Sequence, residues 1–319
     1  MANVACIGAG TVGRAWAVVF ARAGHQVRLY DANPTEVVER SLPLATKTLE
    51  LLAAAGLLEE SVATVLGRIS VTDSIATAVA SAAYVQESVR EDVETKREVF
   101  SAIVDAAPET AILASSTSAI RASEFLGHIR APERALVAHP VNPPSLIPLV
   151  ELCASAWTSD ATLDAAKTFL TAAGMKPVTV LKEIDGFLLN RLQFTLVAEA
   201  MHLVGEGYCS IEDIDRVLTE GLALRWAFIG PFEVAHLNAP DGFKGFVDRL
   251  GPMMRHLGAE AQTSYDWTGK VEDMHSELVA RTPVADIAAR QAWRDDQILR
   301  LRQLKRDSAG PTAPNASTR

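Results

Sequence analysis

The sequence predicts an α/β fold, a doubly wound and mostly parallel sheet with a helical-hairpin insertion, followed by an all-α C-terminal domain. Up to about residue 182, short runs rich in β-branched residues alternate with helical patterns, which is typical of parallel strands joined by helices. From residue 185 onward, long helical patterns replace the strands. We expect a sheet domain over residues 1–184, a helical domain over 185–306 and a disordered tail over 307–319.

The predicted strands are short and mostly leave room for a helix between them. They cover residues 3–7, 26–31, 84–86, 111–114, 135–138, 149–153 and 177–181. Between the second and third of these strands, apolar residues of the segment 34–73 recur at helical spacing, which predicts a helical hairpin that turns near Gly56. In the second half, residues 186–205 predict a long helix, and Ser210 with Asp213 predicts the capped start of another.

The first predicted strand runs into a glycine-rich turn with the spacing of a dinucleotide-binding motif. Gly8 permits a tight turn, Gly10 lets the backbone approach a pyrophosphate, and Gly13 lets the next helix pack closely. The N-terminal amides of that helix point at the phosphates. Asp31, which ends the second strand, is placed to accept both ribose hydroxyls and repels a 2′-phosphate, so NAD is favoured over NADP. The predicted cofactor contacts are Gly8, Gly10, Thr11, Val12, Gly13 and Asp31.

Composition excludes several other classes of protein. The chain of 319 residues, 49% hydrophobic and 22% charged, is typical of a soluble globular protein with two domains. Its net charge of −9 offers no broad basic face for nucleic acid. Three widely spaced cysteines indicate a reducing compartment and neither a disulfide framework nor a metal site. Glycines and Arg14 interrupt the apolar N-terminus, so we expect a cytoplasmic protein without a signal peptide or membrane partner.

Polar side chains gather where predicted strands end, and ligands of open α/β sheets bind beyond those ends. His139 closes one strand, and its ordinary pKa suits a base that takes a hydroxyl proton. Glu151 follows in the next strand and can fix the imidazole tautomer. Ser118 and Asn190 can hydrogen-bond a substrate oxygen. A structural histidine, a turn serine and a helix cap are the respective alternatives.

Six segments together resemble the L-3-hydroxyacyl-CoA dehydrogenase superfamily over nearly the whole chain, and most closely its lambda-crystallin branch of L-gulonate 3-dehydrogenases. They are GAGTVG with Asp31, VQES around Glu87, SSTS at 115–118, HPVNPP at 139–144, LVEL around Glu151 and GFLLNR at 186–191. The resemblance implies that His139 is the base, Glu151 its partner, and Ser118 and Asn190 the ligands of the substrate oxygen. It also implies a Rossmann domain, a helical domain and a dimer. On this basis we add Glu87, Ser116 and Asn142 to the predicted cofactor-binding residues.

Two departures from the acyl-CoA enzymes bear on the substrate. In the acyl-CoA enzymes that this chain resembles, the helix that contacts CoA tends to be lysine-rich. Residues 49–60 here hold three glutamates and no basic residue. This negative charge disfavours a phosphorylated ligand. Arg225 lies beside an aromatic residue and can clamp a carboxylate through two hydrogen bonds. A helix-end salt bridge is an equally weighted alternative for Arg225.

Three functions follow from these observations. The first is NAD-dependent oxidation of the 3-hydroxyl of a short free 3-hydroxy acid such as L-gulonate. The second uses the same chemistry on an acyl-CoA thioester such as 3-hydroxybutyryl-CoA. The third is a NAD-binding structural protein of crystallin type, against which the complete set of catalytic residues argues. Wide apolar faces on the predicted C-terminal helices favour a homodimer through that domain, although a thick internal core explains the same residues.

Overall fold

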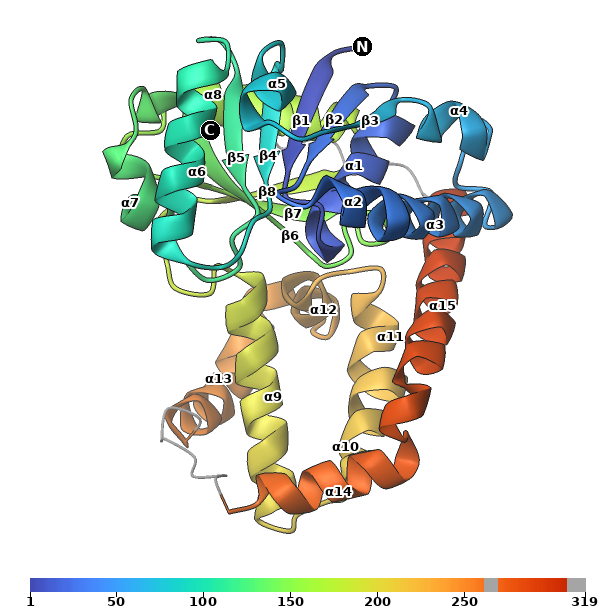
Figure 1. Ribbon diagram of the computed structural model, residues 1–319. Helices are drawn as coiled ribbons and strands as arrows, with labels where there is room; N and C mark the ends of the chain where they lie inside the picture. Colours follow the sequence, from blue (N-terminus) through green and yellow to red (C-terminus); the bar gives the residue numbers. More distant parts are fainter. Residues whose placement is uncertain (261–268, 309–319) are drawn as a thin grey trace. The chain divides into compact units, whose positions relative to one another are not determined.

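A computed structural model describes residues 1–260 and 269–308, which form two compact units (Figure 1). Among the described residues, the first unit contains residues 1–191 and 293–308, and the second contains residues 192–260 and 269–292. Most of the predicted tail, residues 309–319, lies outside the described residues, whereas Asp307 still belongs to the last helix.

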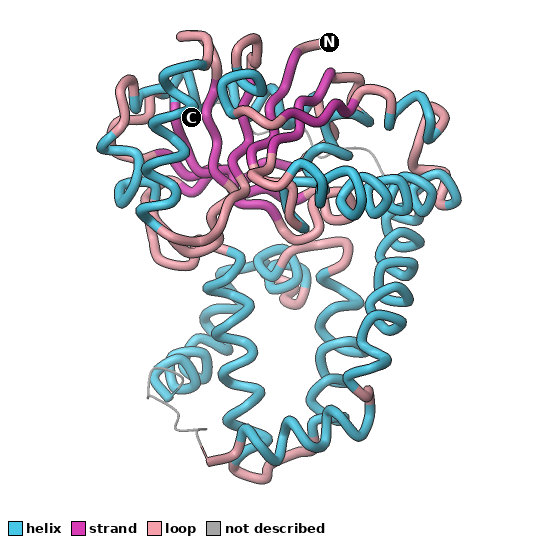
Figure 2. Tube along the Cα trace, viewed as in Figure 1, coloured by secondary structure: helices cyan, strands magenta, loops and turns pink. Residues whose placement is uncertain are grey.

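The first unit is built on a single sheet, drawn in magenta in Figure 2. Within residues 1–191 its strand order is β3-β2-β1-β4-β5-β6-β7-β8, and all neighbours are parallel except β6 and β7. The strands are β1 (Asn3–Ile7), β2 (Gln26–Tyr30), β3 (Ile69–Thr72), β4 (Tyr84–Glu87), β5 (Ile112–Ser115), β6 (Ala135–Pro140), β7 (Leu149–Ala154) and β8 (Lys176–Val180). The prediction of a doubly wound, mostly parallel sheet is confirmed.

The segment between β2 and β4 differs from its prediction in one respect. It begins with helices, and the chain turns at Gly56, whose φ is +61°, as expected. However, Ile69–Thr72 forms β3, which pairs with β2 at the sheet edge, so the prediction of helix up to residue 73 was wrong there. Residues 69–72 alternate apolar and polar side chains, but they directly follow a run of helical spacing that conceals this short pattern. The helical elements are α2 (Pro34–Glu36), the π-helix Val37–Ser41, α3 (Leu42–Ala54) and α4 (Val62–Leu66).

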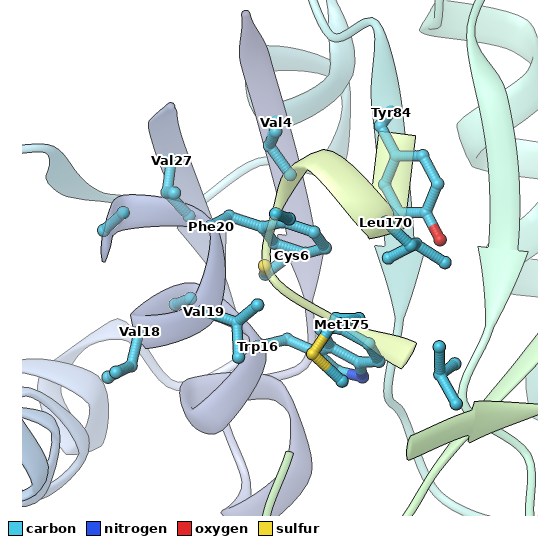
Figure 3. Close-up of a cluster of buried hydrophobic side chains, with 14 of the residues drawn as sticks. Val4, Cys6, Trp16, Val18, Val19, Phe20, Val27, Tyr84, Leu170 and Met175 are labelled. Carbon is cyan, nitrogen blue, oxygen red and sulfur yellow. The ribbon is translucent and has the colours of Figure 1, made fainter. Parts of the chain in front are cut away.

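Helices cover both faces of the sheet and bury two apolar clusters. On one face, α1 (Thr11–Arg22) places Trp16 and Phe20 against β1 and β4, as Figure 3 shows, and the two rings stack at 5.2 Å between centroids. Tyr84 stacks on Phe169 of α8 (Asp160–Ala172) at 4.6 Å. On the other face, α6 and α7 contribute Phe100 and Phe125. The helices of this face are α5 (Ile75–Val79), α6 (Val93–Ala106) and α7 (Ala122–Phe125). The 3-10 turns Leu126–His128 and Pro132–Arg134 follow α7 in the chain.

The last helix returns to the first unit. In α15 (Ile287–Asp307), Leu299 is buried in the core of the sheet domain. Arg302 donates hydrogen bonds to the carbonyl oxygens of Ser145 and Leu146, at 3.2 and 2.8 Å. Gln303 and Arg306 bind the carbonyl oxygens of Ala55 and Gly56. The compact units therefore differ here from the predicted consecutive domains, because this largely polar helix carries no apolar stripe that indicates its partner.

The second unit is helical throughout its described residues, as predicted. It begins within α9 (Leu189–Gly205), and Ser210 caps α10 by accepting a hydrogen bond from the amide of Asp213 at 3.0 Å, as expected. The other elements are α10 (Ile211–Arg216), the π-helix Val217–Leu222, α11 (Ala223–Trp226), α12 (Pro231–Leu237), α13 (Gly242–Glu260), α14 (Val271–Arg281) and the 3-10 turn Val284–Asp286. Across the described part of the chain, every helix is too short or too polar to cross a membrane.

The glycine-rich turn gives a prediction about the packing of α1 on β1. A Cβ at position 13 would lie 1.8 Å from the carbonyl oxygen of Gly8, whereas a Cβ at position 10 meets nothing within 4 Å. We expect Gly13→Ala to lower the free energy of unfolding by about 1–3 kcal/mol, because α1 must move off β1. The matched variant Gly10→Ala should change it by less than about 1 kcal/mol. Urea denaturation measures both, and equal losses would contradict this account.

Candidate active site

The loop between β1 and α1 is shaped for the approach of a diphosphate. Gly8 has a φ of +98°, and a Cβ there would lie 2.5 Å from the carbonyl oxygen of Ser88. At Gly10, which precedes the first turn of α1, the space is open. Thr11 is exposed at that turn, while Val12 packs partly against the core and offers its backbone amide. The open cradle and the free amides of the helix start fit the pyrophosphate of a dinucleotide.

A cavity of about 330 Å³ adjoins this loop. Asp31 lies in its wall, where its Oδ2 accepts a hydrogen bond from the amide of Ala9 at 2.8 Å and its Oδ1 one from the amide of Asn33 at 3.2 Å. These bonds hold the carboxylate beside the glycine-rich turn, at the position from which it can receive ribose hydroxyls. The cavity is lined by Ala9, Gly10, Thr11, Arg14, Asp31, Asn33, Glu36, Val37, Arg40 and Ser41.

His139 and Glu151 lie directly opposite each other on β6 and β7, the antiparallel neighbours of the sheet. The imidazole Nδ1 is 2.8 Å from Oε2 of Glu151, and both side chains are buried, with exposed fractions of 4% and 1%. Because a carboxylate only accepts hydrogen bonds, Nδ1 carries the proton. In the neutral imidazole, Nε2 therefore keeps its lone pair and can accept a proton.

Glu151 also fixes the start of α9. Its Oε1 accepts hydrogen bonds from the amides of Leu188 and Leu189, at 2.8 and 3.0 Å. Burial alone would raise the pKa of Glu151, but the hydrogen bonds from His139 and the two amides outweigh burial, and the pKa lies below its ordinary value. Glu151 is therefore ionised near neutral pH and stabilises a protonated His139. Phe187, with a φ of +50°, packs its ring 5.2 Å from the imidazole.

Ser118 and Asn190 lie next to each other in the same unit. The side-chain amide of Asn190, in the first turn of α9, donates a hydrogen bond to the carbonyl oxygen of Ser118 at 3.0 Å. Ser118 is exposed, and its hydroxyl makes no hydrogen bond with a described residue. Asn142, two residues beyond the end of β6, is exposed as well. The hydroxyl of Ser118 and the second side-chain amide hydrogen of Asn190 can therefore donate to a ligand oxygen.

Comparison with known proteins decides the family. Residues 3–184 match the NAD-binding domain, and residues 186–264 the C-terminal domain, of 3-hydroxyacyl-CoA dehydrogenase. The chain belongs to the 3-hydroxyacyl-CoA dehydrogenase family. It is an oxidoreductase of that family with its NAD-binding Rossmann domain.

Three relatives of this chain carry different names. A lambda-crystallin homolog from Bos taurus is 40% identical over 308 residues, 95% of each chain. An L-carnitine dehydrogenase from Nocardiopsis dassonvillei is 34% identical over 316 residues, covering 98% of this chain and 95% of the relative. The crystal structure of 5-formyl-3-hydroxy-2-methylpyridine 4-carboxylic acid 5-dehydrogenase, an NAD⁺-dependent dismutase, superposes with a TM-score of 0.82 at 30% identity, covering 95% of this chain and 98% of that one.

Two residues that the family resemblance assigned to the cofactor have other partners in the structure. Glu87 is fully buried, where it binds Nζ of Lys96 at 3.0 and 3.1 Å and accepts hydrogen bonds from Ser115 and the amide of Val89. Both of its oxygens accept hydrogen bonds from protein donors, so in this structure the side chain supports the strand ends. Its contact with the cofactor stays a prediction.

The hydroxyl of Ser116 is likewise saturated by protein groups. It accepts hydrogen bonds from Trp16 Nε1 at 3.1 Å and from Gln86 Nε2 at 2.8 Å, and it pairs with the hydroxyl of Ser88 at 2.8 Å. The Ser116 hydroxyl thus links α1, β4 and the segment after β5. Its contact with the cofactor stays a prediction.

Glu91 was missed by the sequence analysis. Its Oε1 accepts hydrogen bonds from the hydroxyl of Thr117 at 2.6 Å and from the amides of Ser118 and Ala119 at 2.8 and 2.9 Å. Lys96 Nζ lies 3.4 Å from its other oxygen. Glu91 thus holds the turn that presents Ser118. Its sequence neighbours include several other acids, a pattern that equally indicates a solvated helix start.

Arg225 lies in the second unit, in the short helix α11. Its side chain is exposed and makes no hydrogen bond or ion pair with any residue in the described ranges 1–260 and 269–308. The alternative of a helix-end salt bridge is therefore absent from the described structure.

The buried lysine gives a prediction about the support of the site. Replacing Lys96 by Met leaves the Glu87 carboxylate buried without its cation, which should lower the free energy of unfolding by about 3–5 kcal/mol. The double variant Lys96→Met/Glu87→Gln should recover most of this loss, because a neutral amide needs no counter-charge. Lys47→Met, at an exposed lysine of α3, should stay within about 0.5 kcal/mol. Chemical denaturation measures the stability of all three variants. A Lys96→Met variant as stable as the wild type would refute the pairing of Lys96 with Glu87.

Proposed function

We propose that this chain is an NAD-dependent dehydrogenase that oxidises the 3-hydroxyl of a short free 3-hydroxy acid such as L-gulonate. The buried pair of His139 and Glu151, 2.8 Å apart, carries the proposal. It is a base held in one tautomer by a carboxylate, in a family with an NAD-binding domain.

Each residue of the site has a chemical task in this reaction. His139 Nε2 takes the proton of the substrate hydroxyl, and Glu151 stabilises the resulting imidazolium. The hydroxyl of Ser118 and the amide of Asn190 hydrogen-bond the oxygen as it changes from hydroxyl to carbonyl. NAD, when bound, would supply the acceptor for the hydride that leaves C3. A proton and a hydride thus leave the carbinol, and the products are a 3-keto acid, NADH and a protonated histidine.

Two observations support a free acid over a thioester. In the helical insertion, Glu50 and Glu59 are exposed, and Glu60 is the partner of Arg68, so the segment presents negative charge where a lysine-rich helix binds CoA in the resembling enzymes. In addition, a relative 34% identical to this chain is named for L-carnitine, which is chemically a free 3-hydroxy acid. The family's own name keeps 3-hydroxybutyryl-CoA as the second candidate substrate.

We propose Arg225 as the group that recognises the substrate carboxylate. Its guanidinium is exposed and has no partner among the described residues, and the planar group matches a carboxylate through two parallel hydrogen bonds. Arg225→Ala should raise KM for the free acid about 10-fold or more, since a charge-assisted pair contributes about 1.5–3 kcal/mol. An unchanged KM would remove the clamp from the proposal.

We also propose that the chain forms a homodimer through its helical unit and resides in the cytoplasm. Large apolar side chains are exposed on α9, where Leu192 and Phe194 show 73% and 60% of their surface, and a self-complementary contact would cover them. Light scattering in solution should give twice the mass of the 319-residue chain. A monomer at micromolar concentration would contradict the dimer.

The substrate proposal is tested by following NADH formation with L-gulonate, L-carnitine, L-3-hydroxybutyrate and L-3-hydroxybutyryl-CoA side by side. We expect turnover of a free acid and loss of that turnover in His139→Ala, by a factor of about 10² or more. Turnover of the thioester alone would reject the free-acid proposal and favour the second candidate. Binding of NAD without turnover of any substrate would favour the crystallin-type structural role.

A further inference from the structure

We infer that Arg14 is a phosphate-binding residue of the NAD site, with its guanidinium on the 5′-diphosphate of the bound cofactor and Arg40 adding positive charge nearby. The inference rests on NAD binding by this family and is independent of the proposed substrate. It adds a side-chain cation to a site that otherwise offers backbone amides.

The position of Arg14 in α1 directs its side chain to the cofactor loop. Arg14 is the fourth residue of the helix, and helical side chains lean toward the N-terminus of their helix. Arg14 lies one turn beyond Gly10 and on the same face as Thr11, and all three line the cavity of about 330 Å³ that also contains Asp31. The guanidinium therefore extends the row of free amides at the helix start.

Arg14 has no counter-charge of its own. Its partly buried side chain forms no hydrogen bond or ion pair with any described residue, whereas Arg40 on the same cavity binds Glu36 at 3.1 Å. The Asp31 carboxylate lines the same cavity but forms no ion pair with Arg14, and each of its oxygens accepts one backbone amide and keeps a lone pair for a ribose hydroxyl. Burial, and then the charge of Arg40, lower the pKa of Arg14. A partly buried guanidinium that has no ion-pair partner among the described residues is available to bind an anion in this cavity.

The anion that fits is the diphosphate of the cofactor and not a 2′-phosphate. The Asp31 carboxylate is fixed in the cavity wall by the amide of Ala9 at 2.8 Å, where it favours ribose hydroxyls and repels a phosphate on the ribose. The open cradle at Gly10 lies on the side of the cavity formed by α1, which is also the side of Arg14. The polar groups of the cofactor are thus divided: the ribose hydroxyls donate to Asp31, and the phosphates accept from Arg14 and the amides of the helix start.

Isothermal titration of the full chain tests this assignment with NAD, ADP, 2′,5′-ADP and adenosine. Arg14→Gln should bind NAD and ADP about 10- to 100-fold more weakly than the wild type, the effect of one charge-assisted hydrogen bond to phosphate. Its affinity for adenosine should be unchanged. Lys47→Gln removes the same charge from the exposed face of α3 and should leave every affinity within about 2-fold, because salt screens a distant surface charge.

Three results would overturn the inference. These are unchanged binding of NAD and ADP by Arg14→Gln, an equal loss for adenosine, which places Arg14 on the base or ribose, and a loss confined to 2′,5′-ADP, which makes it a 2′-phosphate ligand. If Arg14→Gln fails to fold, Arg14→Lys keeps the charge and should retain most of the ADP affinity. Failure of the wild type to bind NAD would instead refute the cofactor assignment itself, a separate outcome.

Discussion

One buried carboxylate connects the parts of the candidate active site. Glu151 holds His139 through one oxygen at 2.8 Å and the amides of Leu188 and Leu189 through the other, at 2.8 and 3.0 Å. It therefore sets the orientation of the imidazole and the position at which α9 begins, and with it the place of Asn190. Because three hydrogen bonds depend on its negative charge, the same interactions keep the pKa of Glu151 low.

The sheet topology makes this arrangement possible. β6 and β7 are antiparallel neighbours within a sheet whose other pairs are parallel, and their register places His139 directly across from Glu151. A slip of one residue would turn one of the two side chains to the opposite face. Arg302 of α15 donates hydrogen bonds to the carbonyl oxygens of Ser145 and Leu146, in the loop that follows β6. A helix distant in sequence therefore supports the segment that follows His139.

A second buried cluster supports the other side of the site. Lys96 binds Glu87 and approaches Glu91, and Glu91 accepts three hydrogen bonds from the turn of Ser118. Burying the charges of Lys96 and Glu87 is favourable only because each is the partner of the other, whereas Glu91 is exposed. The rigid support leaves the exposed hydroxyl of Ser118 as the group available to a ligand, in agreement with pre-organised donors around a reacting oxygen.

The sequence predicted the parts of this structure that repeat a strong local pattern. The strands with β-branched runs, the glycine-rich turn with Asp31, and the capped start of α10 at Ser210 are local features and were confirmed. The edge strand β3 and the return of α15 were not predicted, because the first directly follows a run of helical spacing and the second lacks an apolar stripe. Glu91 was missed for a related reason, since its hydrogen bonds to the turn of Ser118 join side chains and amides from separate segments.

The most direct test of the account is the tautomer of His139, measured by ¹⁵N NMR of the histidine side chains above their titration range. His139→Asn identifies the signal among those of the seven histidines. We predict that Nδ1 carries the proton toward Glu151 and that Nε2 is unprotonated and able to act as a base. A proton on Nε2 would show that the pair is not arranged for proton abstraction and would contradict the proposed mechanism.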